Sequence, residues 1–195
     1  MSLYIKRGKD TRRVRAMVAN LADIPNGVTL NQEELVNGSI IPEGALVSRD
    51  SAGMGHLVKT AEIYDTAGST AKSYKIKKGS QFKVGDVVML TVGGAAYAIT
   101  AIDRESSSVF DTITVGTTLG AASEGDVLKL AATAGTSGAL KYSPVAILGD
   151  GYNVDGTNQF VVAVTIGQFK NALVAPIDNE LKTALHNNGA YINFV

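Results

Sequence analysis

The chain has 195 residues, 18 acidic and 18 basic side chains, and neither cysteine nor tryptophan. This length suits one domain with a substantial core or two small ones, and the lack of cysteine excludes a disulfide framework, a thiolate metal site and a cysteine nucleophile. No apolar run reaches the roughly 20 residues of a membrane span, and no apolar signal core follows the basic N-terminus. Short β-branched runs separated by glycine, asparagine and serine predict a mostly β protein.

Residues 1–36 predict an extended N-terminal arm. Residues 1–15 hold six basic side chains and one acidic side chain, whereas the rest of the chain holds 12 basic and 17 acidic ones. The six basic residues are Lys6, Arg7, Lys9, Arg12, Arg13 and Arg15. Apolar residues such as Met17, Val18 and Leu21 recur after them, and a purely solubilising tail would lack these. We therefore expect an arm that becomes ordered against a partner; the alternative is a frayed terminus with ordinary surface charge.

Residues 37–65 predict a β-hairpin with polar tips. A turn at Pro42–Gly44 precedes a strand over 45–49, a second turn covers 50–53, and a partner strand follows over 54–63. We group this hairpin with residues 139–195 as one β core.

Residues 66–138 predict a small inserted β domain. Segments of small residues flank it, and five short strands are expected over 74–77, 87–92, 97–103, 112–115 and 127–130. A Gly-Asp pair leads into a strand twice, 40 residues apart, and five short strands favour a small barrel or sandwich. Five lysines between residues 72 and 83 are interpreted as a solvated strand face, because a nucleic-acid surface would need interleaved aromatic residues and arginine.

Residues 139–195 predict a strand, a short helix and a terminal strand. The uncharged run 159–166 reads as a central strand, and its side chains on one face are predicted core or oligomer contacts: Phe160, Val162, Val164 and Ile166. Asp178 is the expected N-cap of the helix, Leu181 and Leu185 are part of its apolar stripe, and Gly189 ends it. An alternating strand follows over 191–195.

No arrangement of residues indicates catalysis. The two histidines, His56 and His186, are assigned ordinary structural roles, and no Gly-x-Ser-x-Gly nucleophile elbow occurs. Asp150 and Asp155 offer oxygen ligands, but their loop lacks the glycine and distal glutamate of an EF-hand, so they are interpreted as turn residues. We expect no catalytic residue, no metal and no cofactor.

Several stretches together resemble the head decoration proteins of tailed phages, of the lambda type. They are IIPEGALVSRDSAG (40–53), PVAILGDG (144–151), DGT (155–157), FVVAVTIGQFKNAL (160–173), LKTAL (181–185) and GAYINF (189–194). The resemblance covers less than half of the chain, and residues 66–138 have no counterpart in the minimal fold. It implies copies that sit on the outside of an expanded capsid, clamp the major capsid protein and associate as trimers. It also implies that residues 1–36 become ordered on binding.

The expected architecture is mostly β: a small sandwich- or barrel-like decoration core with one short C-terminal helix, an inserted small β-barrel domain and an extended N-terminal arm. The expected function is that of a structural protein on the exterior of a virion, made in the host cytoplasm, without enzymatic activity, membrane attachment or direct contact with nucleic acid. One alternative is a head fibre, tail or surface adhesin component whose middle domain binds glycans or a host surface. A nucleic-acid binder that uses the basic arm is another, and an enzyme is the least favoured.

Overall fold

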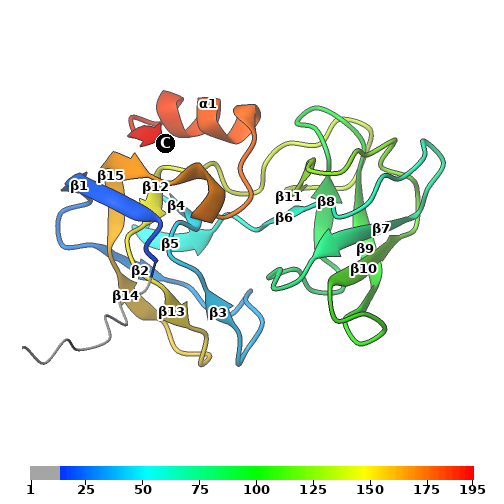
Figure 1. The fold of residues 1–195 in the computed structure, drawn as a ribbon, viewed down its shortest axis with the longest axis horizontal. Helices are drawn as coiled ribbons and strands as arrows, with labels where there is room; N and C mark the ends of the chain where they lie inside the picture. The colour runs from blue at the N-terminus through cyan, green and yellow to red at the C-terminus, as the bar shows by residue number, and fades with distance from the viewer. Residues whose placement is uncertain (1–13) are drawn as a thin grey trace, which may run out of the picture.

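The computed structural model describes residues 14–195, which form two β lobes side by side (Figure 1). The first lobe comprises residues 14–57 and 139–195, and the second lobe comprises residues 60–138. The prediction of a mostly β protein with one short C-terminal helix is confirmed. No helix in the described part of the chain is long and apolar enough to cross a membrane.

The first lobe is built around an eight-stranded sheet. Its strands, in spatial order, are β1 (Met17–Asp23), β15 (Ala163–Phe169), β12 (Ala146–Leu148), β4 (Leu46–Arg49), β5 (Met54–Leu57), β2 (Val28–Leu30) and β14 (Gln159–Val161), with β16 (Tyr191–Phe194) parallel to β15. Only Val162 separates β14 from β15. The row of strands therefore returns to the segment from which it started, and the sheet curls into a barrel-like wall around a buried core.

The N-terminal segment is part of this wall. Along one side of β14 and β15, the pairing runs from Met17 opposite Phe169 to Leu30 opposite Gln159. Gly27, at φ +59°, turns the chain between β1 and β2. The extended arm predicted for residues 1–36 is therefore wrong for residues 14–36, because backbone pairing with a strand about 150 residues away holds them on the body. Residues 1–13 lie outside the described part of the chain.

The single α-helix among residues 14–195, α1 (Asn179–Asn187), covers the outer face of this wall. The Asp178 carboxylate accepts a hydrogen bond of 2.9 Å from the Leu181 amide, as expected of an N-cap. Leu181 and Leu185 are fully buried against the sheet, and Gly189 adopts φ +87° just after the helix. A short 3-10 helix, η1 (Asn171–Leu173), precedes α1, and β3 (Ile40–Ile41) pairs with β13 (Tyr152–Asn153) at the edge of the lobe.

One face predicted for the run 159–166 is not uniform. Val164 is fully buried under α1 and Val162 is partly buried, but Phe160 is 61% exposed and Ile166 is 38% exposed. Register shifts between β1 and β15 interrupt the alternation of faces. The two exposed side chains are therefore on the surface of the isolated chain.

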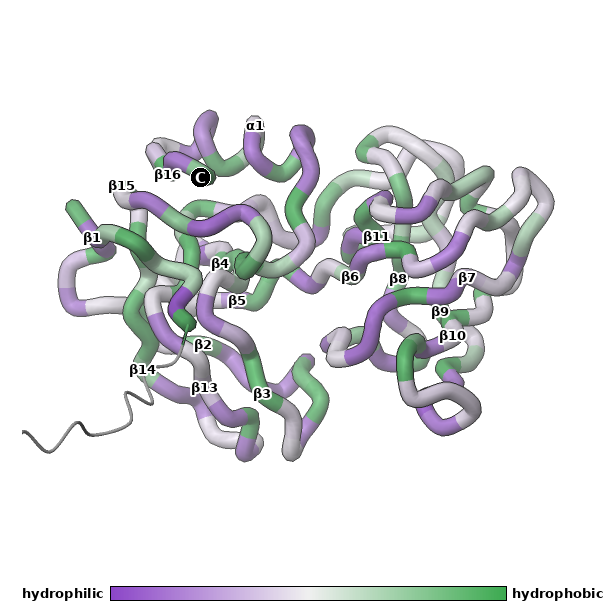
Figure 2. Tube along the Cα trace, viewed as in Figure 1, coloured by the Kyte–Doolittle hydropathy of each residue, from purple (hydrophilic) through white to green (hydrophobic). Residues whose placement is uncertain are grey.

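The second lobe is a six-stranded sheet that closes on itself. Its order is β6 (Thr60–Glu62), β11 (Val127–Leu130), β8 (Val87–Met89), β9 (Ala96–Asp103), β10 (Phe110–Val115) and β7 (Ser73–Lys77). A bridge between Ile63 and Ile76 joins the two ends of this row. Tyr74, Phe82 and Ile113 are among the fully buried side chains at its centre, and Figure 2 shows hydrophobic stretches along the strands of both lobes.

The boundary between the lobes lies earlier than the expected Thr66. The predicted strand over 54–63 is divided, because β5 ends at Leu57 in the first sheet and β6 begins at Thr60 in the second. The chain bends between them at Val58 and Lys59, and no glycine or proline marks that bend in the sequence.

Candidate functional site

The residues considered for catalysis or metal binding do not converge. The ring of His56 stacks on Tyr142 at 4.4 Å, whereas His186 meets Tyr191 edge-on at the end of α1. Asp155 accepts hydrogen bonds from the amide and the hydroxyl of Thr157, at 2.9 and 2.6 Å, as a turn residue does. Among residues 14–195, no group of three or more histidine, aspartate or glutamate side chains is arranged to hold a metal ion.

Arg15 anchors the beginning of the described chain to the first lobe. Its guanidinium donates to the Gly149 carbonyl at 2.7 Å and to the Asp150 carboxylate at 2.9 Å, and it lies 3.3 Å from Glu43. The same Glu43 carboxylate accepts a hydrogen bond of 2.8 Å from the Met17 amide. Arg15 and Met17, both predicted arm residues, therefore belong to the body; Lys6, Arg7, Lys9, Arg12 and Arg13 lie outside the described residues.

The clearest candidate for an interaction surface is the free edge of β1. This strand pairs with β15 on one side, and no strand of the described chain pairs with its other side. Three apolar side chains on or beside it are largely exposed: Val14 at 78%, Val18 at 50% and Leu21 at 77%. An unpaired strand edge with exposed apolar side chains is a template for an added strand from another chain. We call Val14, Val18, Leu21 and the backbone of β1 the β1 edge.

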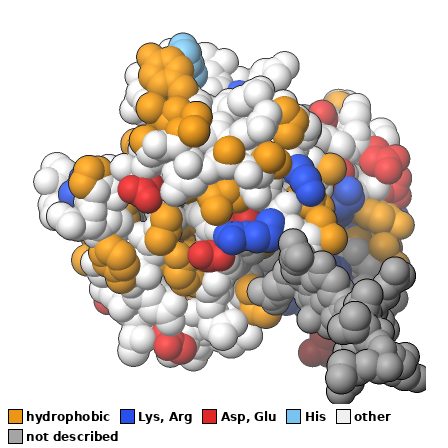
Figure 3. Space-filling view, turned by 60° about the vertical axis from the view of Figure 1, so that its left-hand side comes forward, with side chains coloured by type: hydrophobic (Ala, Val, Ile, Leu, Met, Phe, Trp, Pro, Cys, Tyr) orange, Lys and Arg blue, Asp and Glu red, His pale blue; other side chains and the backbone are white. Residues whose placement is uncertain are grey.

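A second exposed apolar row adjoins the β1 edge across the sheet. Ile166 of β15 pairs with Ala22 of β1 on one side and with Tyr191 of β16 on the other, so these three side chains share one face. Tyr191 is 58% exposed and the C-terminal Val195 is 56% exposed. Figure 3 shows hydrophobic side chains in several groups on this side of the molecule, one of them beside a histidine at the top.

A buried ion cluster joins the two lobes at the start of α1. The Lys129 ammonium, on β11 of the second lobe and 1% exposed, lies 2.5 Å from Asp178 and 2.8 Å from Glu180. It also donates to the Leu90 carbonyl at 2.5 Å, and the Val92 amide donates to Glu180 at 3.1 Å. We call Lys129, Asp178 and Glu180 the interlobe lock, because it connects the second lobe to the N-terminus of α1.

Lys59 forms a related pair where the chain enters the second lobe. This side chain is 1% exposed and its ammonium lies 2.8 Å from Asp86. Burial lowers the pKa of Lys59, and the contact with Asp86 only partly offsets that effect. The sequence patterns did not predict that Lys59 and Lys129 are buried. For Lys129, one feature could have indicated it: a single lysine stands within the otherwise apolar strand Val127–Leu130.

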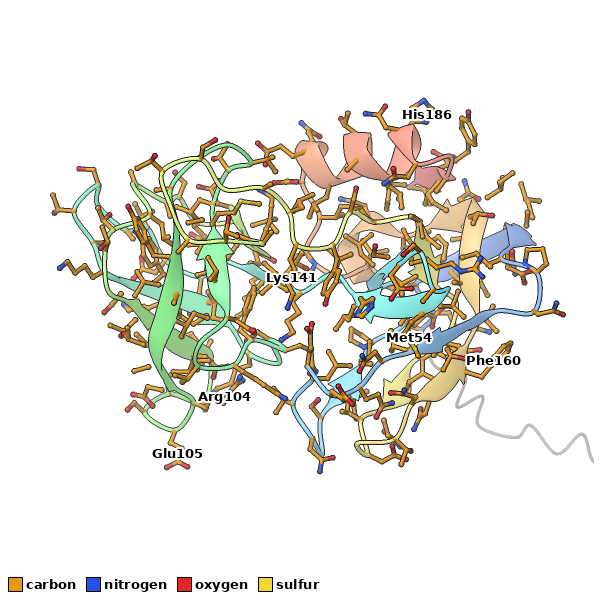
Figure 4. The ribbon with its side chains drawn as sticks, turned by 180° about the vertical axis from the view of Figure 1, so that it is seen from behind. Met54, Arg104, Glu105, Lys141, Phe160 and His186 are labelled. Carbon is orange, nitrogen blue, oxygen red and sulfur yellow. The ribbon has the colours of Figure 1, made fainter. Side chains whose placement is uncertain are left out.

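Glu34 holds residues 141 and 142 in place, where the chain returns from the second lobe to the first. Its carboxylate accepts hydrogen bonds from the Lys141 ammonium at 2.8 Å and the Tyr142 hydroxyl at 2.9 Å. Burial alone would raise the pKa of Glu34, but these two partners outweigh it and the pKa is lowered. Figure 4 shows Lys141 between the two lobes. The lobes are thus connected by packed side chains as well as by the chain itself.

None of the protein-family models, curated proteins or solved structures compared with this chain matches it.

Proposed function

We propose that this chain is a structural protein of a virus head that binds the outside of the capsid shell and stabilises it. The proposal starts from the resemblance of residues 40–53 and 144–194 to phage head decoration proteins. The observation that supports it most is the β1 edge, which offers unpaired backbone and exposed apolar side chains and follows the basic residues 6–13 in the sequence.

The β1 edge suits attachment to a larger protein surface. A strand from a capsid subunit that pairs with β1 would satisfy its free backbone groups and cover Val18 and Leu21. Full burial of a valine or leucine side chain contributes about 1.5–3 kcal/mol. This single-site contribution is modest, but a shell that presents many identical sites strengthens the attachment of an oligomer by avidity. The proposed partner is therefore the major capsid protein, bound by several linked copies of this chain.

The charge distribution supports the same partner. Residues 1–13 hold five basic side chains and one acidic one, whereas residues 14–195 hold 13 basic and 17 acidic ones. A basic segment that precedes the β1 edge in the sequence would be attracted to an acidic patch on the shell and would speed encounter at low salt. Duplex DNA also attracts basic segments, so the experiment must separate the two partners.

Co-sedimentation tests the proposal directly. The protein is mixed with expanded capsids or with linear duplex DNA and pelleted at low and at physiological salt. We expect it to pellet with capsids at both salt concentrations and to stay in solution with DNA at physiological salt. The variant V18K/L21K should no longer pellet with capsids, whereas V84K, which alters a 62% exposed valine of the second lobe, should bind normally. Equal binding of V18K/L21K and the unchanged protein would exclude the β1 edge as the attachment site.

A second candidate function places binding on the second lobe, as a fibre or adhesin component would. Tyr64 and Phe110 stack on the outside of this lobe at 5.3 Å, with the Lys75 ammonium 5.2 Å from the centre of the Phe110 ring. Partly exposed aromatic rings beside charged groups are a platform on which sugar rings can stack. Glycan-array binding that is lost in F110A and retained in V18K/L21K would favour this function over capsid attachment.

A further inference from the structure

The dipeptide Asn-Gly occurs three times in this chain, beginning at Asn26, Asn37 and Asn188. In this dipeptide the asparagine side chain is readily attacked by the next backbone nitrogen, because glycine has no side chain to shield that nitrogen and its backbone is the most adaptable. The fold places the same two residues in three different environments. Their reactivity should therefore differ in a way that the structure determines.

The side chain of Asn188, just after α1, is held in place. Its Nδ2 donates to the Ser143 hydroxyl and to the Pro144 carbonyl, both at 2.8 Å. The Gly189 amide donates in turn to the His186 carbonyl at 2.9 Å. Breaking two side-chain hydrogen bonds of ordinary strength slows a reaction that requires it by about 5- to 150-fold.

The turn at Asn26 is exposed, but its backbone is tightly packed. The Gly27 amide donates to the Ile24 carbonyl at 2.8 Å. A Cβ at Gly27 would lie 2.4 Å from the Phe160 ring and 2.7 Å from the Val161 carbonyl oxygen, so there is no space around this residue. The turn cannot rearrange unless the neighbouring strand β14 moves as well.

The pair at Asn37 has the fewest constraints. Asn37 and Gly38 are both exposed, and the Asn37 side chain forms no hydrogen bond with any residue of the described range 14–195. No atom lies within 4 Å of a Cβ built at Gly38. The Gly38 amide does donate to the Val154 carbonyl at 2.8 Å, but this bond extends a sheet of only two strands, β3 and β13, with two residues each. So short a ladder opens locally at a lower cost than the eight-stranded sheet does.

We propose that Asn37 is a site of spontaneous modification, at which asparagine is converted to aspartate and isoaspartate. The Gly38 nitrogen forms a bond to Cγ of Asn37 and gives up its proton, and Nδ2 leaves as ammonia, which closes a succinimide ring. Water then opens the ring at either carbonyl. One opening yields aspartate, and the other yields isoaspartate, in which the backbone runs through the former side chain. Water is the only co-reactant, and no catalytic residue is required.

The modification would loosen a contact between the lobes. The Val36 amide and the Ser39 hydroxyl, on either side of the Asn37–Gly38 pair, donate to the Gln81 side-chain oxygen at 3.0 and 3.1 Å. Isoaspartate adds one methylene to the backbone between them, so both donors can no longer meet Gln81 of the second lobe. The inference does not depend on the proposed attachment to a capsid, because neither Asn37 nor Gly38 belongs to the β1 edge.

Incubation of the whole chain at mildly alkaline pH tests the proposal, with aspartate and isoaspartate at the three positions measured over time by peptide mass spectrometry. We expect product first at Asn37, and a rate at Asn188 that is lower by about 5- to 150-fold. In urea that unfolds the chain, the three rates should become similar. Reaction at Asn37 that is no faster than at Asn188 in the folded protein, or the same order of rates in urea, would overturn the proposal.

Two variants provide matched controls. S143A removes one of the two acceptors of Asn188, so it should raise the rate at Asn188 by about two- to twelvefold and leave the rate at Asn37 unchanged. N37Q keeps a side-chain amide at an exposed position, so it should fold normally and form no product there, because glutamine would have to close a larger ring. Hydrogen exchange at the Val36 amide should become faster in the aged protein and stay unchanged in aged N37Q. Unchanged exchange in the aged protein would contradict the loosening of the contact with Gln81.

Discussion

Removing the two carboxylates of the interlobe lock should reveal how much the buried Lys129 depends on them. The variant D178N/E180Q keeps the size of both side chains and leaves an asparagine that can still cap α1. The Lys129 ammonium, 1% exposed, can then still donate to the Leu90 carbonyl and to the amide oxygens at positions 178 and 180, but no negative charge remains beside it. The free energy of unfolding should fall because a buried charge has lost its compensation.

The exposure of Asp178 and Glu180 determines how much the free energy of unfolding should fall. Removing the partner of a buried ion pair costs about 3–5 kcal/mol. Asp178 and Glu180 are 27% and 35% exposed, so water reaches part of the cluster and the lower end of that range applies. For a chain of this size, about 3 kcal/mol corresponds to a decrease of about 6–12 °C in Tm.

The assay is thermal and urea unfolding followed by circular dichroism, with K129M/D178N/E180Q as the matched control. An apolar side chain of similar volume removes the stranded charge, so most of the lost stability should return. A decrease in the free energy of unfolding of less than about 1 kcal/mol in D178N/E180Q would show that the two carboxylates do not compensate the charge of Lys129. The same conclusion would follow if adding K129M did not raise the free energy of unfolding again.

Three further outcomes are expected. In urea titrations, G27A should lower the free energy of unfolding by about 2–4 kcal/mol, because Gly27 has φ +59° and an added Cβ would lie 2.4 Å from the Phe160 ring. The control G38A should lower it by only about 1–2 kcal/mol, because Gly38 also has positive φ but has open space around it. The hydrogen bond from His56 lowers the pKa of Asp50 from its ordinary value, so the stabilisation it gives is present above the pKa of an unfolded aspartate and is lost as the pH falls through the lowered pKa. The variant D50N should therefore lose less stability on acidification, measured by unfolding at a series of acidic pH values. L21K should leave Tm unchanged within about 2 °C, because Leu21 is 77% exposed.

Local patterns predicted the second lobe and the C-terminal unit well. The five strands expected within 66–138 correspond to β7 to β11, and the helix after Asp178 ends as its capping residues predict. These signals are short-range, since alternation, caps and turn residues act within a few positions along the chain. These signals did not predict β6 as a separate strand, because the alternation of apolar and polar residues over 54–63 continues through the bend at Val58 and Lys59.

The N-terminal region was misjudged for a related reason. A run of positive charge is typical of a solvated tail, but Arg15 meets Glu43 and Asp150, which are 28 and 135 residues away along the chain. No residue near Arg15 in the sequence indicates that it would contact Glu43 and Asp150. The same holds for Lys129, which meets its carboxylates only after the lobes come together.

The ribbon formed by residues 17–30 and 159–169 has a consequence for biosynthesis. As the polypeptide leaves the ribosome, β1 and β2 emerge long before β14 and β15 exist, whereas all six strands of the second lobe emerge within a span of about 70 residues. The second lobe can therefore acquire its structure while translation continues, and the first lobe must wait until β14 and β15 have been made. During that interval the apolar strands of the first lobe are unprotected, which makes it the part of the nascent protein with the greater need for a chaperone.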